Sequence, residues 1–177
     1  MSETLQKVTA LMVGVIIAFA SLALISSTQA GAWGKSWIER SNQPNIAEIA
    51  VNNGSFDTLV TALQCTGLDR VVSSKWVRLT VFAPTDDAFS KLNLTSENVC
   101  DEFSKRELRN ILLYHVTWGV RDSNRVLNSS SFRMLNWQRA PIDASVPSIA
   151  NAQLNTDQLK IRASNGIIHV VNDVMLP

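Results

Sequence analysis

The stretch TVFAPTDDAF, residues 80–89, constrains the fold most, because a strand has to end and a helix has to begin within it. Strand-forming residues lead into Pro84, and proline keeps the residue before it extended. Thr85 can then cap a helix whose first turn holds Asp86 and Asp87, where the helix dipole favours negative charge. A catalytic pair would need a nucleophile or a metal beside it, and neighbouring helix positions point about 100° apart. We therefore interpret the two aspartates as a helix start.

Residues 8–25 form an apolar run without a charged residue. Lys7 precedes the run and small residues follow it, which is typical of a signal peptide that ends near residue 32. The run is also nearly long enough to cross a bilayer, so an uncleaved signal anchor is the alternative for residues 1–32. Residues 33–42 are predicted to be a short linker. The rest of the chain is expected outside the cytoplasm, either secreted into an extracellular or periplasmic space or anchored to a membrane by residues 8–25.

Composition limits the partners of the protein. The chain of 177 residues is 46% hydrophobic, which suits one domain plus the N-terminal segment, and its formal net charge is +1. It contains no run of lysine and arginine, whereas nucleic-acid binding needs a concentrated basic patch. We therefore expect no nucleic-acid partner, and a membrane contact only if the N-terminal segment is retained.

Cys65 and Cys100 are the two cysteines, and an exported chain carries them into an oxidising compartment. They are predicted to form a disulfide. The two histidines, His115 and His169, lie at no short spacing from a cysteine, so a zinc site would need four scattered residues. His115 also has no recognisable nucleophile motif nearby. We expect no metal, no cofactor and no enzymatic activity.

Helical spacing and end signals predict helices over residues 45–54 and 55–67, the second capped by Ser55, with a short helical turn after it. Ser104 and Glu107 form a capping box for another helix, which should run to about residue 113 and lead into a strand. Helices and strands thus alternate with short connections from residue 43 onward. The pattern predicts one α+β domain.

Asn165 and Gly166 indicate a hairpin near the C-terminus, because this dipeptide tolerates two positive φ angles in a two-residue turn. Such a turn would place Ala163 opposite Ile168. The other face of the hairpin is less apolar, so His169 is expected on the wetter side or against a neighbouring element, as a structural residue rather than a ligand.

Three blocks in order resemble the signatures of a fasciclin-type (FAS1) domain: TVFAPTDDAF, LLYHV and NGIIHVVNDVMLP. The resemblance covers residues 43–177. It implies a FAS1-like β-wedge or sandwich of about seven strands, with several helices packed along one edge.

The resemblance also implies a function, because members of this family are mostly extracellular or surface proteins that mediate cell adhesion through contacts with other proteins. It does not imply an enzyme. Segments proposed to contact receptors in animal members correspond here to two sets of residues, Tyr114 with His115, and Asn172, Asp173, Val174 and Met175. A structural role is the alternative for the second set, as part of a buried final strand.

A second function follows from the same resemblance, since some fasciclin-type proteins resemble carriers of an apolar pigment such as a carotenoid. Trp76, Trp118 and Trp137 could offer flat apolar surfaces to such a ligand, although packing in the core is the commoner role of tryptophan. Three Asn-x-Ser/Thr sites are further expected to carry glycans if the chain passes through a eukaryotic secretory pathway. They are Asn53, Asn93 and Asn128.

Overall fold

The computed structural model describes residues 43–156 and 160–177. Residues Asn42–Pro177 form one compact unit. The predicted signal peptide and linker lie outside the described residues, and their boundaries stay predictions. No helix within the described ranges is long and apolar enough to cross a membrane.

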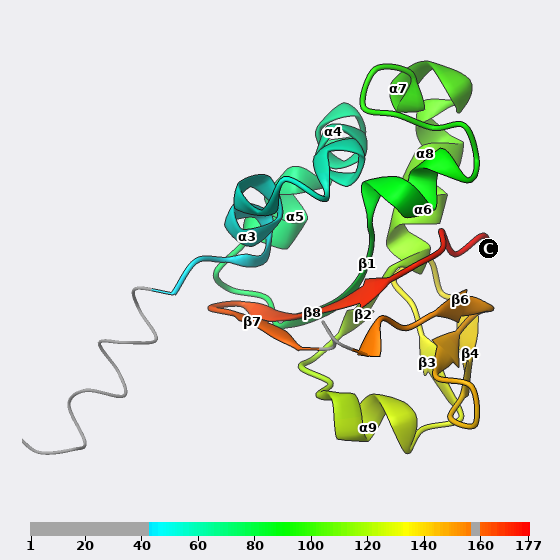
Figure 1. Ribbon diagram of the computed structural model, residues 1–177. Helices are drawn as coiled ribbons and strands as arrows, with labels where there is room; N and C mark the ends of the chain where they lie inside the picture. The colour runs from blue at the N-terminus through cyan, green and yellow to red at the C-terminus, as the bar shows by residue number, and fades with distance from the viewer. Residues whose placement is uncertain (1–42, 157–159) are drawn as a thin grey trace, which may run out of the picture. The chain divides into compact units, whose positions relative to one another are not determined.

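The unit is an α+β fold with two four-stranded sheets. Figure 1 shows how the helices and strands are arranged. Strand order is β2-β1-β8-β7 in the first sheet and β3-β4-β5-β6 in the second. The strands are β1 (Leu79–Pro84), β2 (Val116–Trp118), β3 (Ser131–Arg133), β4 (Arg139–Asp143), β5 (Ser148–Ile149), β6 (Ala152–Gln153), β7 (Ile161–Ala163) and β8 (Gly166–Val171). The helices are α3 (Ile46–Asn53), α4 (Asp57–Thr66), α5 (Asp69–Ser73), α6 (Asp86–Ser90), α7 (Val99–Glu102), α8 (Lys105–Tyr114) and α9 (Ser123–Leu127). The predicted fold class is confirmed, with eight described strands where about seven were expected.

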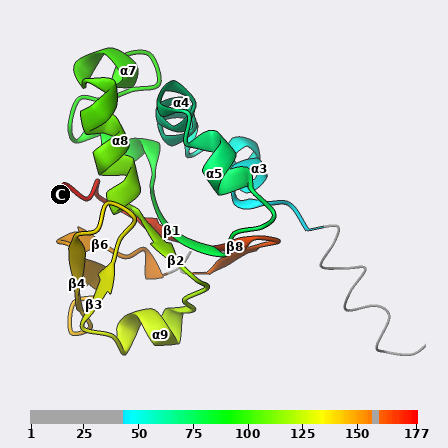
Figure 2. The same cartoon turned by 180° about the vertical axis from the view of Figure 1, so that it is seen from behind.

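The first sheet separates two hydrophobic cores. Its central pair, β1 and β8, runs parallel, and successive side chains of a strand point to opposite faces. Val81 and Ala83 pack into the core under the helices, whereas Phe82 packs into the core shared with the second sheet. Figures 1 and 2 show the helices α3 to α5 on one side of this sheet and the second sheet with α9 on the other. All residues of β1 and β8 are buried, as two covered faces require.

Thr85 and the two aspartates start a helix, as predicted. Thr85 is the N-cap of α6 and accepts a hydrogen bond from the Ala88 N–H, and both aspartates lie in the first turn. Asp86 has a second role, because its carboxylate accepts hydrogen bonds from the backbone N–H groups of Asp57 and Thr58 at 3.2 and 2.8 Å. It therefore caps α4 from another part of the chain.

The predicted Ser55 cap of α4 is wrong. The N-cap of this helix is Phe56, whose side chain makes no capping hydrogen bond. Phe56 is instead buried in the first core. A helix that begins with an apolar residue leaves its first N–H groups without a local acceptor, and Asp86 supplies the acceptor.

The hairpin exists, but its predicted register is wrong by two residues. Ala163 pairs with Gly166, so the turn residues are Ser164 and Asn165, and Ile168 pairs with Ile161. Neither Asn165 nor Gly166 has a positive φ. Of the two placements expected for His169, the wetter side is wrong, because the side chain is fully buried and stacks on Phe82 of the neighbouring strand β1.

Asn165 and Gly166 are required by tertiary contacts. The buried Asn165 amide accepts a hydrogen bond from the Ile46 N–H and donates to the carbonyls of Val72 and Ser74. A Cβ added at Gly166 would lie 2.0 Å from the Leu79 carbonyl oxygen, which excludes any larger residue without a shift of the backbone. The dipeptide thus fastens the hairpin to α3 and β1.

Cys65 and Cys100 form a disulfide in the structure, with Cα atoms 6.2 Å apart. Cys65 lies in α4 and Cys100 in α7, so the bond joins two helices on the same side of the first sheet. Figure 2 shows α7 at the end of α8, away from the strands.

Candidate functional site

His115 and the C-terminal segment, two of the predicted partner-binding elements, meet in the structure. The imidazole lies at the end of α8, where Nδ1 donates to the Ile111 carbonyl at 2.8 Å. Nε2 accepts a hydrogen bond from the Met175 N–H at 3.0 Å. Nδ1 therefore carries the proton, and both ring nitrogens are engaged inside the protein.

Burial keeps His115 neutral. The residue is 2% exposed, and desolvation lowers its pKa from 6.5 to about 4. Hydrogen bonding to the Ile111 carbonyl opposes this shift only in part. A neutral histidine with no free nitrogen serves as a hydrogen-bonded link between α8 and the end of the chain.

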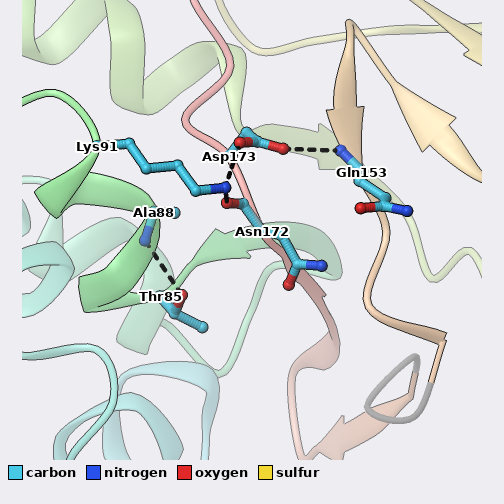
Figure 3. A network of polar contacts seen from close by, with 6 residues as sticks. All are labelled: Thr85, Ala88, Lys91, Gln153, Asn172 and Asp173. Atoms are coloured by element: carbon cyan, nitrogen blue, oxygen red, sulfur yellow. Dashed lines mark hydrogen bonds and ion pairs between the residues drawn. The ribbon is translucent and has the colours of Figure 1, made fainter.

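Asn172 and Asp173 lie just beyond β8, at the edge between the two sheets (Figure 3). Lys91 Nζ forms an ion pair with the Asp173 carboxylate at 2.7 Å and donates to the Asn172 carbonyl at 2.8 Å. The other Asp173 oxygen accepts from the Gln153 N–H at 3.4 Å, a long hydrogen bond. The side chain of Asp173 is 39% exposed, so this pair contributes little to stability in itself. Its geometry nonetheless ties α6 and β6 to the C-terminal segment.

The segment does not continue the final strand as expected, because β8 ends at Val171. Met175 is fully buried in the second core and Val174 packs partly buried against the first. Tyr114 is also buried, and its hydroxyl donates to the Arg139 carbonyl at 3.3 Å. Burial raises the pKa of this hydroxyl. These contacts show that the predicted residues have a structural role. Partner binding by them stays a prediction.

Lys91 and Gln153 belong to this site and were not predicted. Lys91 follows α6 and has no motif of its own, and Gln153 contributes a backbone N–H, which no side-chain pattern reveals. No group of three or more His, Cys, Asp or Glu is placed to hold a metal ion in residues 43–156 and 160–177. The three predicted glycosylation sites are exposed, and their modification stays a prediction.

The expectation that tryptophans pack in the core is wrong for the three that the structure describes. Trp76, Trp137 and Trp118 are 96%, 75% and 55% exposed. Trp118 and Trp137 line the same pocket of about 390 Å³, which we call the arginine pocket because Arg121, Arg125 and Arg133 also line it. It is formed by the end of β2, helix α9, strand β3 and the turn after β3.

The family model of the fasciclin domain matches residues 54–177. The chain belongs to the fasciclin family. "Uncharacterized protein sll1735" of a Synechocystis strain is 37% identical to this chain over 139 residues, covering 75% of this chain and 98% of the relative. "Transforming growth factor-beta-induced protein ig-h3" of Sus scrofa is 29% identical over 132 residues, covering 75% of this chain but 19% of the relative.

The solved structure of a FAS1 domain pair from the insect cell adhesion molecule Fasciclin I has a similar fold. Its TM-score is 0.61 at 13% sequence identity, and the match covers 76% of this chain and 51% of that chain. This level of identity supports the fold alone. The recognition of a fasciclin domain from its three motifs is thus confirmed.

Proposed function

We propose that this fasciclin domain is a binding module that acts outside the cytoplasm, secreted or tethered to a surface, and contacts an extracellular or cell-surface protein. The exposure of its tryptophans is the observation that carries the proposal. Large aromatic side chains are enriched at protein interfaces, and they are uncommon on surfaces that contact only water. Two of the exposed indoles, Trp118 and Trp137, line one pocket and indicate a surface that a partner covers.

Trp137 supports this interpretation further. Its backbone has φ 71°, in the left-handed region that bulky residues rarely adopt. Strain of this kind often accompanies function. The turn thus holds an exposed indole in place at a cost of about 1–3 kcal/mol in backbone strain.

Catalysis has little support from the residues that could perform it. His115 is neutral with both nitrogens engaged, and Asp86 and Asp173 accept hydrogen bonds from within the domain. A general base needs a nitrogen or oxygen within reach of a substrate proton. The role that we propose is therefore a non-enzymatic one.

Carriage of an apolar molecule, the second hypothesis, receives less support. The cavity between α3, α4 and the first sheet measures about 20 Å³, which holds roughly one water molecule. A carrier has to enclose most of its ligand in several hundred Å³. The arginine pocket is larger, but its guanidinium groups do not suit a purely apolar ligand.

Crosslinking on intact cells tests the proposal. We expect the full-length protein to crosslink to a surface protein, and Trp137→Ala to weaken that crosslink without lowering the melting temperature. Val51→Ala is a matched control, because it removes an exposed apolar side chain from α3, outside the arginine pocket. A stoichiometric apolar small molecule in native mass spectrometry, with no crosslinked partner, would contradict the proposal.

A further inference from the structure

The arginine pocket carries a concentration of positive charge. Arg121, Arg125 and Arg133 line it together, and no aspartate or glutamate among the described residues does. Asp122 follows Arg121 in the sequence, but its carboxylate is the N-cap of α9 and accepts a hydrogen bond from the backbone N–H of Arg125. In the described part of the chain, none of these three guanidinium groups has a carboxylate within ion-pair distance.

Buried polar side chains of the first sheet hold Arg121 in place. Its backbone N–H donates to Thr80 Oγ1 at 2.8 Å, and its backbone carbonyl lies 2.7 Å from His169 Nε2. Thr80 and His169 are both fully buried, in β1 and β8. The Arg121 guanidinium lies over the Phe132 ring at 5.6 Å, and its Nε is buried without a hydrogen-bond acceptor among the described residues.

Arg133 is positioned in a similar way. Its carbonyl accepts a hydrogen bond from Thr117 Oγ1 at 2.8 Å, and Thr117 is 3% exposed. The guanidinium lies 5.9 Å from the centre of the Trp137 ring. Buried side chains thus hold the backbone at both arginines, and each guanidinium lies over an aromatic ring. Preorganised groups lose less entropy on binding.

The chemistry of this pocket selects an anion with an apolar neighbour. Guanidinium groups bind carboxylates through paired hydrogen bonds, and Trp118 and Trp137 offer flat apolar faces at the rim. Arginine and tryptophan are also the residues that most often dominate protein interfaces. The charges gather in one concavity rather than in a stripe that tracks a polymer, which favours a protein segment over a polysaccharide.

We propose that the arginine pocket is the partner-binding surface of this domain, and that it recognises aspartate or glutamate side chains on an exposed segment of a protein partner. This inference rests on the proposed function and adds the place and the chemistry of the contact. The pocket volume of about 390 Å³ suits a few side chains, which form the centre of a larger interface.

The test is a titration of the isotope-labelled full-length chain, purified in a neutral detergent, with an acetylated and amidated hexaglutamate peptide. We expect the indole N–H signals of Trp118 and Trp137 to shift, and the shifts to shrink at high salt. Trp76 is an internal control, because it is exposed but does not line the pocket. Arg125→Gln and Arg133→Gln should each weaken binding at least about tenfold, since each removes a charge-assisted contact.

Arg70→Gln is the matched control for charge, because it removes one exposed arginine from α5, and it should change affinity less than about twofold. The proposal is wrong if hexaglutamine shifts the same signals, if the two pocket variants bind like Arg70→Gln, or if no pocket signal moves. It is also wrong in its choice of partner if hexagalacturonate binds more tightly than hexaglutamate. A surface partner whose crosslink is insensitive to Arg125→Gln and Arg133→Gln would leave the binding-module function standing and remove only this pocket.

Discussion

Acid should destabilise this domain through His115. Its pKa is about 4 in the folded protein and 6.5 when exposed, so the unfolded chain binds a proton more readily between these values. The stabilising contribution is complete above about pH 6.5, declines as the pH falls, and is gone below about pH 4. A difference of about 2.5 pKa units corresponds to about 3 kcal/mol, a large share of the 5–15 kcal/mol typical of a domain.

Urea unfolding of the wild type and His115→Gln at several pH values measures this effect. Glutamine offers a donor and an acceptor but does not titrate, so it isolates the contribution of the imidazole. At about pH 7.5 we expect the variant to be less stable by about 1–3 kcal/mol, because two buried hydrogen bonds are disturbed. The difference in unfolding free energy between the two proteins should narrow or reverse towards pH 4, because only the wild type has to keep a buried imidazole neutral. A difference in unfolding free energy that stays constant from about pH 7.5 to pH 4 would refute the reasoning.

Four further predictions concern single features. Asp86→Ala should lower the free energy of unfolding by about 1–2 kcal/mol, because it removes the cap of α4. Asp87→Ala, at an exposed site, should lower it by less than about 0.5 kcal/mol. Equal losses of the two variants in urea unfolding would contradict the capping role of Asp86. Gly166→Ala should prevent stable folding because its Cβ would meet the Leu79 carbonyl, and Gly54→Ala, with open space and φ 66°, should cost about 1 kcal/mol; circular dichroism and thermal melts compare the two. Reduction of the Cys65–Cys100 bond, 35 residues apart, should cost about 3–4 kcal/mol in unfolding experiments, and two titratable thiols in protein purified without reductant would count against the bond. The mature chain should begin near Gly31 or Trp33, and N-terminal sequencing that returns Met1 or Ser2 from a membrane fraction would instead establish an anchor.

The sequence predicted well those features whose atoms lie close together along the chain. Thr85 caps α6 and Ser104 caps α8, and each hydrogen bond spans three residues. Such contacts form with little dependence on the rest of the fold, so a local pattern is enough to find them. The same holds for the helix ends at Gly54 and Gly67, which adopt the left-handed conformation.

Contacts between distant parts of the chain were missed. Asn165 was interpreted as a turn residue because Gly166 follows it. Its side-chain amide instead forms hydrogen bonds with the backbone of Ile46 and Val72, which lie 119 and 93 residues away. The missing cap of α4 was likewise supplied by Asp86, 28 residues from Thr58. Nothing in a local window distinguishes these long-range uses from a turn or a dipole effect.

The exposed tryptophans show a different limit. The rule that apolar residues lie inside holds for a population of residues, and a binding surface is a local departure from it. One signal was available in residues 118–139, which contain four arginines and a single acid, Asp122. Read together with Trp118 and Trp137, that imbalance indicates an exposed basic surface, even though the net charge of the whole chain is only +1.

The motif residues and the pocket residues of this fasciclin domain should respond differently to substitution. His115 and Met175 close the fold at the C-terminus through a buried hydrogen bond, so a change there lowers stability first and alters binding only as a consequence. Arg125 and Arg133 are exposed and have no acidic partner in the described residues, so their loss should leave stability within about 0.5 kcal/mol. A scaffold can keep its folding contacts while surface residues set the partner. Measuring stability and binding on the same variants therefore separates the residues that make this domain fold from those that we propose to bind a partner.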